Sequence, residues 1–192
     1  MSTKTQPAFL TGALRSIVIN LAILVLSMCM TIAATAVDDT VKERQQDMKE
    51  IAAAAKAIAG FFKEPETYSS DSFRQAATSI SARADQRLVD HFATMTVAEG
   101  SKATEVIAAE PDRFAALARD LKSYADALAS AADRHPGAMS DDMRMKPGEP
   151  MGGGPLGTRV RNEATLSSMS AEHAFHLMLQ TCSSCHARFR SD

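Results

Sequence analysis

The sequence predicts an all-α protein folded as an antiparallel four-helix bundle. Signals for β-strands are nearly absent, because no run of alternating β-branched residues occurs and alanine is abundant. In four segments the apolar residues recur three and four positions apart, which is the spacing of a helix that buries one face. These segments are 38–62, 71–94, 111–134 and 170–190.

The first helix is predicted over residues 38–62. Asp38, Asp39 and Thr40 mark its start, since carboxylate and hydroxyl groups stabilise the free N–H groups of a helix N-terminus. Pro65 follows its end, where the helix cannot continue. The inward stripe consists of Val41, Met48, Ile51, Ala55, Ile58 and Phe62.

The second and third helices show the same spacing. Segment 71–94 places on one face Phe73, Ala76, Ile80, Ala84, Leu88 and Phe92. Segment 111–134 has an apolar face made of Phe114, Leu117, Leu121, Tyr124 and Leu128. Pro111 is tolerated in a first turn, because its missing N–H would have no partner there. The His-Pro-Gly triplet at 135–137 ends the third helix.

The fourth helix is predicted over 170–190, with Ser170 as its N-terminal cap. One face of this helix carries Ala171, Phe175, Met178, Cys182, Cys185 and Phe189. Two of its cysteines therefore lie on the apolar stripe that packs into the bundle.

Those cysteines belong to Cys182-Ser183-Ser184-Cys185-His186, which has the C-x-x-C-H signature of covalent c-type haem attachment. Each thiol can add to a vinyl group of the haem, and His186 then offers an imidazole to the iron. One rival reading is a redox pair, but no βαβ unit of the thioredoxin kind is predicted. Another is half of a zinc site, but Cys29 is the only other cysteine. We therefore expect one covalent haem c, held inside the helix packing.

Residues 1–36 have the organisation of a cleaved secretory signal peptide. Lys4 and Arg15 give a positive first part, Ile17 to Ala33 is apolar, and Ala34-Thr35-Ala36 is a small-x-small cleavage site. The apolar run is short for a membrane span of about 20 residues. Because c-type haem is attached outside the bacterial cytoplasm, the signal and the haem motif both predict a periplasmic protein that is soluble after cleavage.

The mature chain, 37–192, has a length typical of one domain. Its formal charge would be about −4, since the signal peptide removes two basic residues from a total of −2. This weak acidity does not indicate a nucleic-acid partner. Both remaining cysteines lie in the haem motif, so no structural disulfide is expected.

Residues 135–168 interrupt the helical pattern before the fourth helix. This segment contains a Gly-Gly-Gly-Pro run and no apolar period, so we expect a flexible surface insertion that haem binding does not need. It also contains Met139, Met143, Met145 and Met151, with His135 nearby. Thioethers can select Cu(I), but the composition favours a low-complexity loop over a copper site.

These features resemble the class II cytochromes c, the cytochrome c prime family, whose four-helix bundles carry haem near the C-terminus. The resemblance covers nearly all of 38–190. It rests on a C-x-x-C-H-x-x-F-R run ending at Arg190, a K-x-R-Q-x-x-M-K run starting at Lys42, and segment 99–114. The chain departs from the family by lacking a tryptophan before the third helix and by its long insertion.

The resemblance implies that the distal face of the haem meets Met48, at a position that varies in the family. A leucine there leaves five-coordinate, high-spin iron, whereas a methionine thioether gives six-coordinate, low-spin iron suited to electron transfer. An inward methionine without the resemblance is more often a core filler. With the resemblance, we expect His186 and Met48 to be the axial ligands.

The function expected is that of a periplasmic electron carrier that meets redox partner proteins; the alternative is a five-coordinate cytochrome c prime that binds NO or CO. No arrangement of catalytic residues suggests an enzyme. The resemblance also implies haem-pocket roles for Arg44 and Arg190, and it is compatible with a homodimer.

The remaining helical histidines are expected at the surface. His173 and His176 precede His186 by ten residues or more, at least about 15 Å of helix rise, so neither reaches the same iron. His91 is expected to be solvated or to cap a helix.

Overall fold

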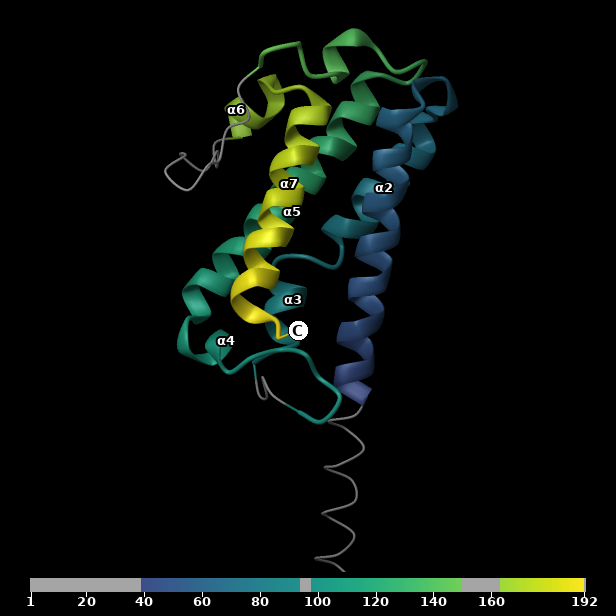
Figure 1. Cartoon of the computed structure of the whole chain (residues 1–192). Coiled ribbons are helices and arrows are strands. Elements are labelled where there is room, and N and C mark those ends of the chain that lie inside the picture. Colours follow the sequence, from purple (N-terminus) through teal and green to yellow (C-terminus); the bar gives the residue numbers. More distant parts are fainter. Residues whose placement is uncertain (1–38, 94–97, 150–162, 192) are drawn as a thin grey trace, which may run out of the picture. The chain divides into compact units, whose positions relative to one another are not determined.

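The computed structural model describes residues 39–93, 98–149 and 163–191, and of 163–165 only the backbone (Figure 1). The predicted signal peptide at 1–36 lies outside the described residues. The described residues from Val41 onward belong to one compact unit.

The described residues of this unit include four long helices, the first of which begins two residues before the unit. They are residues 39–63, α2 (Ser70–Ser81), α5 (Pro111–Arg134) and α7 (Ala171–Phe189). Between them lie the short elements η1 (Pro65–Thr67), α3 (Gln86–Asp90), α4 (Val106–Ala109), η2 (Asp141–Met143) and α6 (Glu163–Ser168). The described residues contain no strand, and the helix α5 packs along both α2 and α7 (Figure 1). The predicted all-α four-helix bundle is confirmed.

The third and fourth helices begin and end close to where the sequence predicts. Pro111 is at the first position of α5, and the helix stops before His135. The Ser170 hydroxyl accepts the backbone N–H of His173 at 3.3 Å and so caps α7.

The second predicted helix, 71–94, is wrong in its continuity, because the structure divides it into α2 and α3. Asp85 has a positive φ of 54° and donates its N–H to the Ala118 carbonyl of α5 at 3.1 Å. With a ψ of −131° this conformation lies outside the left-handed helical region, so it is strained for a residue with a side chain. The bond to α5 replaces a helical one. Leu88 and the earlier apolar residues are nevertheless buried as predicted.

Apart from Val41, the buried apolar side chains of the described residues form two clusters. The larger cluster joins the first helix, α2, the second half of α5 and the start of α7, and it includes Ile58, Phe73, Leu128 and Met178. The smaller cluster joins α3, α4, the start of α5 and the end of α7; its members are Leu88, Ile107, Phe114, Leu117, Ala118 and Phe189. The core is thus divided along the length of the bundle.

The expectation that 135–168 lies only on the surface is wrong for its described part. Met143 is 1% exposed and Leu166 is also buried, both in the larger cluster. The short helix η2 places Met143 against α7. Two buried residues 23 positions apart leave no helical period, which is why the sequence pattern did not reveal them. Flexibility of the Gly-rich part lies outside the described residues and stays a prediction.

No helix in the described residues is long and apolar enough to cross a membrane.

Met143→Ala tests whether the start of the insertion belongs to the core. Because Met143 is fully buried, the substitution should lower the free energy of unfolding by about 2–5 kcal/mol. Lys146→Ala, at an exposed neighbour, should change it by less than about 0.5 kcal/mol. Urea unfolding of the purified holoprotein measures both. Equal, small effects would mean that the insertion contributes no buried surface.

Candidate haem site

The C-x-x-C-H motif occupies the last two turns of α7, where the two apolar clusters approach each other. Cys182 is half-buried against the larger cluster, and Cys185 is half-buried against the smaller one. Met48, on the first helix, is half-buried and packs against both clusters. Met48 and the two cysteines therefore all lie where the larger and the smaller cluster meet.

Burial raises the pKa of both thiols. The pKa of Cys185 rises to about 11, first because of burial and further because of the neighbouring Cys182. The pKa of Cys182 is also raised by burial. A catalytic redox pair needs the opposite, a lowered thiol pKa of the kind found at helix N-termini. These thiols, near the C-terminal end of a helix, do not fit that reading.

A zinc site finds no further ligands in the described part of the chain. There, no group of three or more His, Cys, Asp and Glu side chains is placed to hold a metal ion.

His186 is exposed at the surface of α7. Its pKa is lowered by partial burial and by the positive charge of Arg190. The imidazole is therefore neutral at neutral pH, which is the form that binds a metal.

The end of α7 that carries this motif is fixed to the segment before α4. Thr104 donates its backbone N–H to the Phe189 carbonyl at 3.0 Å, and Ser191 donates to the Lys102 carbonyl at 2.8 Å. Arg188 and Glu110 also form an ion pair. Residues 101–104 were not predicted to hold the motif, since such pairing depends on the fold rather than on a local pattern.

The residues present fit a covalent haem. Two neutral thiols face the inside of the bundle between apolar clusters, and a neutral imidazole follows directly in the sequence. Aromatic side chains also line the smaller cluster, where Phe114 packs edge-to-face on Phe92 and on Phe189. Such surroundings suit a large apolar ring.

Arg44 and Arg190, the predicted haem-pocket arginines, differ in burial. Arg44 is 7% exposed; its guanidinium donates to the His91 carbonyl and lies 4.2 Å from the centre of the Phe92 ring. Arg190 is exposed. Their roles toward the haem stay predictions.

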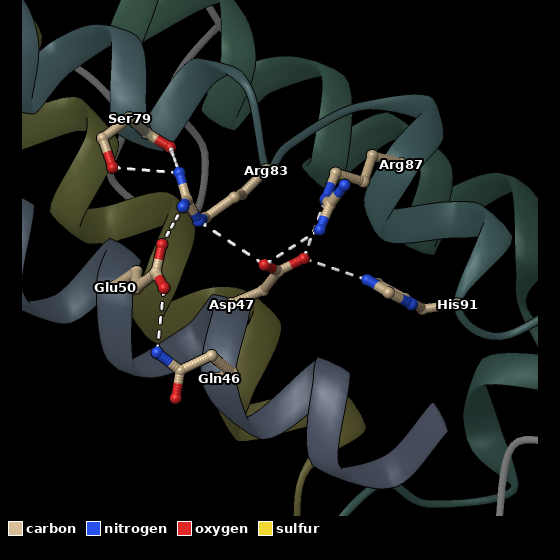
Figure 2. Close-up of polar contacts among 7 residues, drawn as sticks. All are labelled: Gln46, Asp47, Glu50, Ser79, Arg83, Arg87 and His91. Carbon is tan, nitrogen blue, oxygen red and sulfur yellow. Dashed lines mark hydrogen bonds and ion pairs between the residues drawn. The ribbon is translucent and has the colours of Figure 1, made fainter. Parts of the chain in front are cut away.

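A polar network beside Met48 ties the first helix to the ends of α2 and α3 (Figure 2). Its centre is Asp47, which is 5% exposed and accepts hydrogen bonds from Arg87 at 2.9 Å and 3.2 Å. His91 Nε2 lies 3.0 Å from the same carboxylate, which can only accept, so this nitrogen carries the proton. Arg83 lies 3.4 Å from Asp47 and also pairs with Glu50.

The break between α2 and α3 makes this network possible. Arg83 lies in the break and Arg87 lies on α3, so the two guanidinium groups approach Asp47 from different turns. Burial alone would raise the pKa of Asp47, but hydrogen bonds from Arg87 and His91, and their charges, outweigh it and lower the pKa. His91, expected to be solvated or to cap a helix, is the C-cap residue of α3, and its side chain is bonded to Asp47.

Comparison with known proteins decides the family. Residues 39–147, more than half of the chain, match the family model described as Cytochrome C'. The chain belongs to the cytochrome c' family. The crystal structure of cytochrome c' from Thermochromatium tepidum is similar in fold, with a TM-score of 0.57 and 21% sequence identity, over 81% of this chain and 98% of that one. A comparison with curated protein sequences found no match.

As a cytochrome c' family member, the protein is a monohaem c-type cytochrome with one covalent haem. The family match ends before Cys182, so the C-x-x-C-H motif supports the same conclusion independently. The prediction of one covalent haem, attached near the C-terminus of the bundle, is confirmed. The Met48-ligated branch predicted from the sequence is not supported by the comparisons.

Asp47→Asn tests the polar network. Removing the charge leaves three cationic or proton-donating side chains around a neutral amide, so the free energy of unfolding should fall by about 1–3 kcal/mol at pH 7. Asp71→Asn, in an exposed pair with Arg74, should cost less than about 1 kcal/mol. Urea unfolding measures both.

Repeating the unfolding measurements on wild type and Asp47→Asn at low pH tests whether the charge of Asp47 is responsible for the difference. The folded-state pKa of Asp47 is depressed, so its contribution is fully present above the unfolded value of about 3.9. The contribution is lost as pH falls through the lower folded value. The difference between wild type and Asp47→Asn should therefore shrink below about pH 4. A difference that is independent of pH would contradict a role for the charge.

Proposed function

We propose that this chain is a periplasmic cytochrome whose haem is bonded to Cys182 and Cys185, with His186 on the iron and the distal side open to NO or CO. The observation that carries the proposal is the pair of neutral, half-buried thiols between two apolar clusters, in a chain of the cytochrome c' family. The haem, when bound, supplies an iron that can take a further ligand opposite His186.

The surroundings of Met48 favour a small neutral ligand. Its side chain packs against both clusters, so it is part of an apolar wall. An apolar wall opposes the entry of water or anions, which would lose hydrogen bonds there, but it admits diatomic gases. In this reading Met48 narrows the distal pocket without bonding to the iron. Family membership supports this alternative better than the electron-carrier reading.

A second candidate is an electron carrier with Met48 bound to iron. The observation in its favour is that Met48 is only half-buried and contacts the same clusters as Cys182 and Cys185, so its sulfur is not fixed deep in the core. A thioether ligand would raise the reduction potential and exclude other ligands.

The visible spectrum of the ferric protein separates the two candidates. The proposal predicts a high-spin ferric spectrum and rapid CO binding by the ferrous protein. Met48→Leu nearly conserves volume, so it should cost less than about 1.5 kcal/mol and leave the spin state unchanged. Met178→Leu, at a fully buried methionine of α7, serves as the matched control.

A low-spin wild type that becomes high-spin only in Met48→Leu would overturn the proposal. It would establish the electron carrier instead.

Periplasmic location and redox partner proteins are part of the proposal. The signal-peptide pattern of 1–36 supports export, because covalent haem attachment takes place outside the cytoplasm. A homodimer fits the family, and no enzymatic reaction is proposed.

A further inference from the structure

His173, in the first turn of α7, is buried rather than half-exposed as the sequence suggested. The residue is 9% exposed, and its Nδ1 lies 2.7 Å from Glu149 Oε1. The other ring nitrogen, Nε2, is fully buried, and no hydrogen-bond partner for it is found among the described residues. Leaving a buried polar atom unpaired is costly, so this nitrogen requires an explanation.

Glu149 fixes the ring in one tautomer. A carboxylate can only accept a hydrogen bond, so Nδ1 carries the proton when the imidazole is neutral. The lone pair then lies on Nε2. Metal-binding histidines are held in this way, with one ring N–H donated to a carboxylate while the other nitrogen binds the metal.

The methionine-rich segment is attached directly to this turn of α7. Arg144 Nε and the backbone N–H of Met145 both donate to Glu172, at 3.0 Å and 2.9 Å. The backbone N–H of Lys146 donates to Glu149 at 3.1 Å. Segment 144–149 is therefore fixed against the residue next to His173 and against His173 itself.

Three methionines lie in the segments that adjoin this turn. Met143 is buried in the larger cluster, and Met169, one residue before the cap of α7, packs against that cluster. Met145 is half-exposed beside Glu172. The two nearby carboxylates, Glu149 and Glu172, already accept hydrogen bonds. One imidazole with thioethers, and no free carboxylate, is a donor set that selects Cu(I) over hard divalent ions.

We propose that His173 Nε2 binds Cu(I) together with thioether sulfur from Met145 and Met169, and that Glu149 is the positioning residue for the imidazole. Cys182 lies nine residues further along α7, about 14 Å of helix rise, so the copper site is separate from the haem motif. The proposal does not depend on whether the haem iron is five- or six-coordinate.

Competition for Cu(I) with bicinchoninate, on the haem-loaded protein under argon with ascorbate, tests the site. Wild type should bind one equivalent of Cu(I), and His173→Leu should lose that stoichiometric binding. His176→Leu, at the next histidine on α7, is the matched control and should bind as wild type does. Glu149→Gln should weaken binding about 10–100-fold, since it disturbs only the orientation of the ring.

Copper X-ray absorption on the wild type gives a measurement that needs no variant. A nitrogen ligand together with sulfur is expected. Failure of wild type to bind one equivalent, retention of binding in His173→Leu, or a shell with only sulfur or only nitrogen and oxygen would each overturn the site. In that case the buried nitrogen pairs with water.

Discussion

The division of the apolar core into two clusters is the constraint on which the rest of this structure depends. Cys182 packs against one cluster and Cys185 against the other, so the three-residue spacing of the motif spans the division. Met48, on the first helix, packs against both clusters. Two apolar clusters with thiols between them suit a flat apolar group bonded to α7, as expected of a monohaem cytochrome c'.

The polar network around Asp47 holds the first helix where its Met48 packs against both clusters. Asp47 is adjacent to Met48, and its carboxylate gathers groups from the break after α2 and from α3. Fixing Asp47 therefore fixes the backbone that carries Met48. The positive φ of Asp85 is part of the same arrangement, because a straight second helix would keep the N–H of Asp85 in its own ladder rather than on α5. The strained backbone of Asp85 thus accompanies the placement of Arg83 and Arg87 beside Asp47.

Periodic and covalent features could be predicted from the sequence, and long-range polar contacts could not. The apolar stripe of α5 and the cap at Ser170 follow from local spacing, so both were predicted correctly. The haem motif is recognisable because its chemistry requires adjacent residues. Asp47 and Arg87, by contrast, are 40 residues apart, and nothing local distinguishes a buried carboxylate from a solvated one. Met143 is buried by tertiary contacts in a segment without an apolar period, and His173 is buried although it lies off the apolar stripe predicted for α7.

Covalent attachment of a single haem is the central claim, and extraction into acidified organic solvent followed by intact-mass measurement tests it most directly. The account predicts that the haem stays with the polypeptide, that the mass of the chain rises by one haem, and that the pyridine haemochrome shows both vinyl groups saturated by Cys182 and Cys185. A protein that carries no haem, releases it into the solvent, or retains it through only one cysteine would contradict the account.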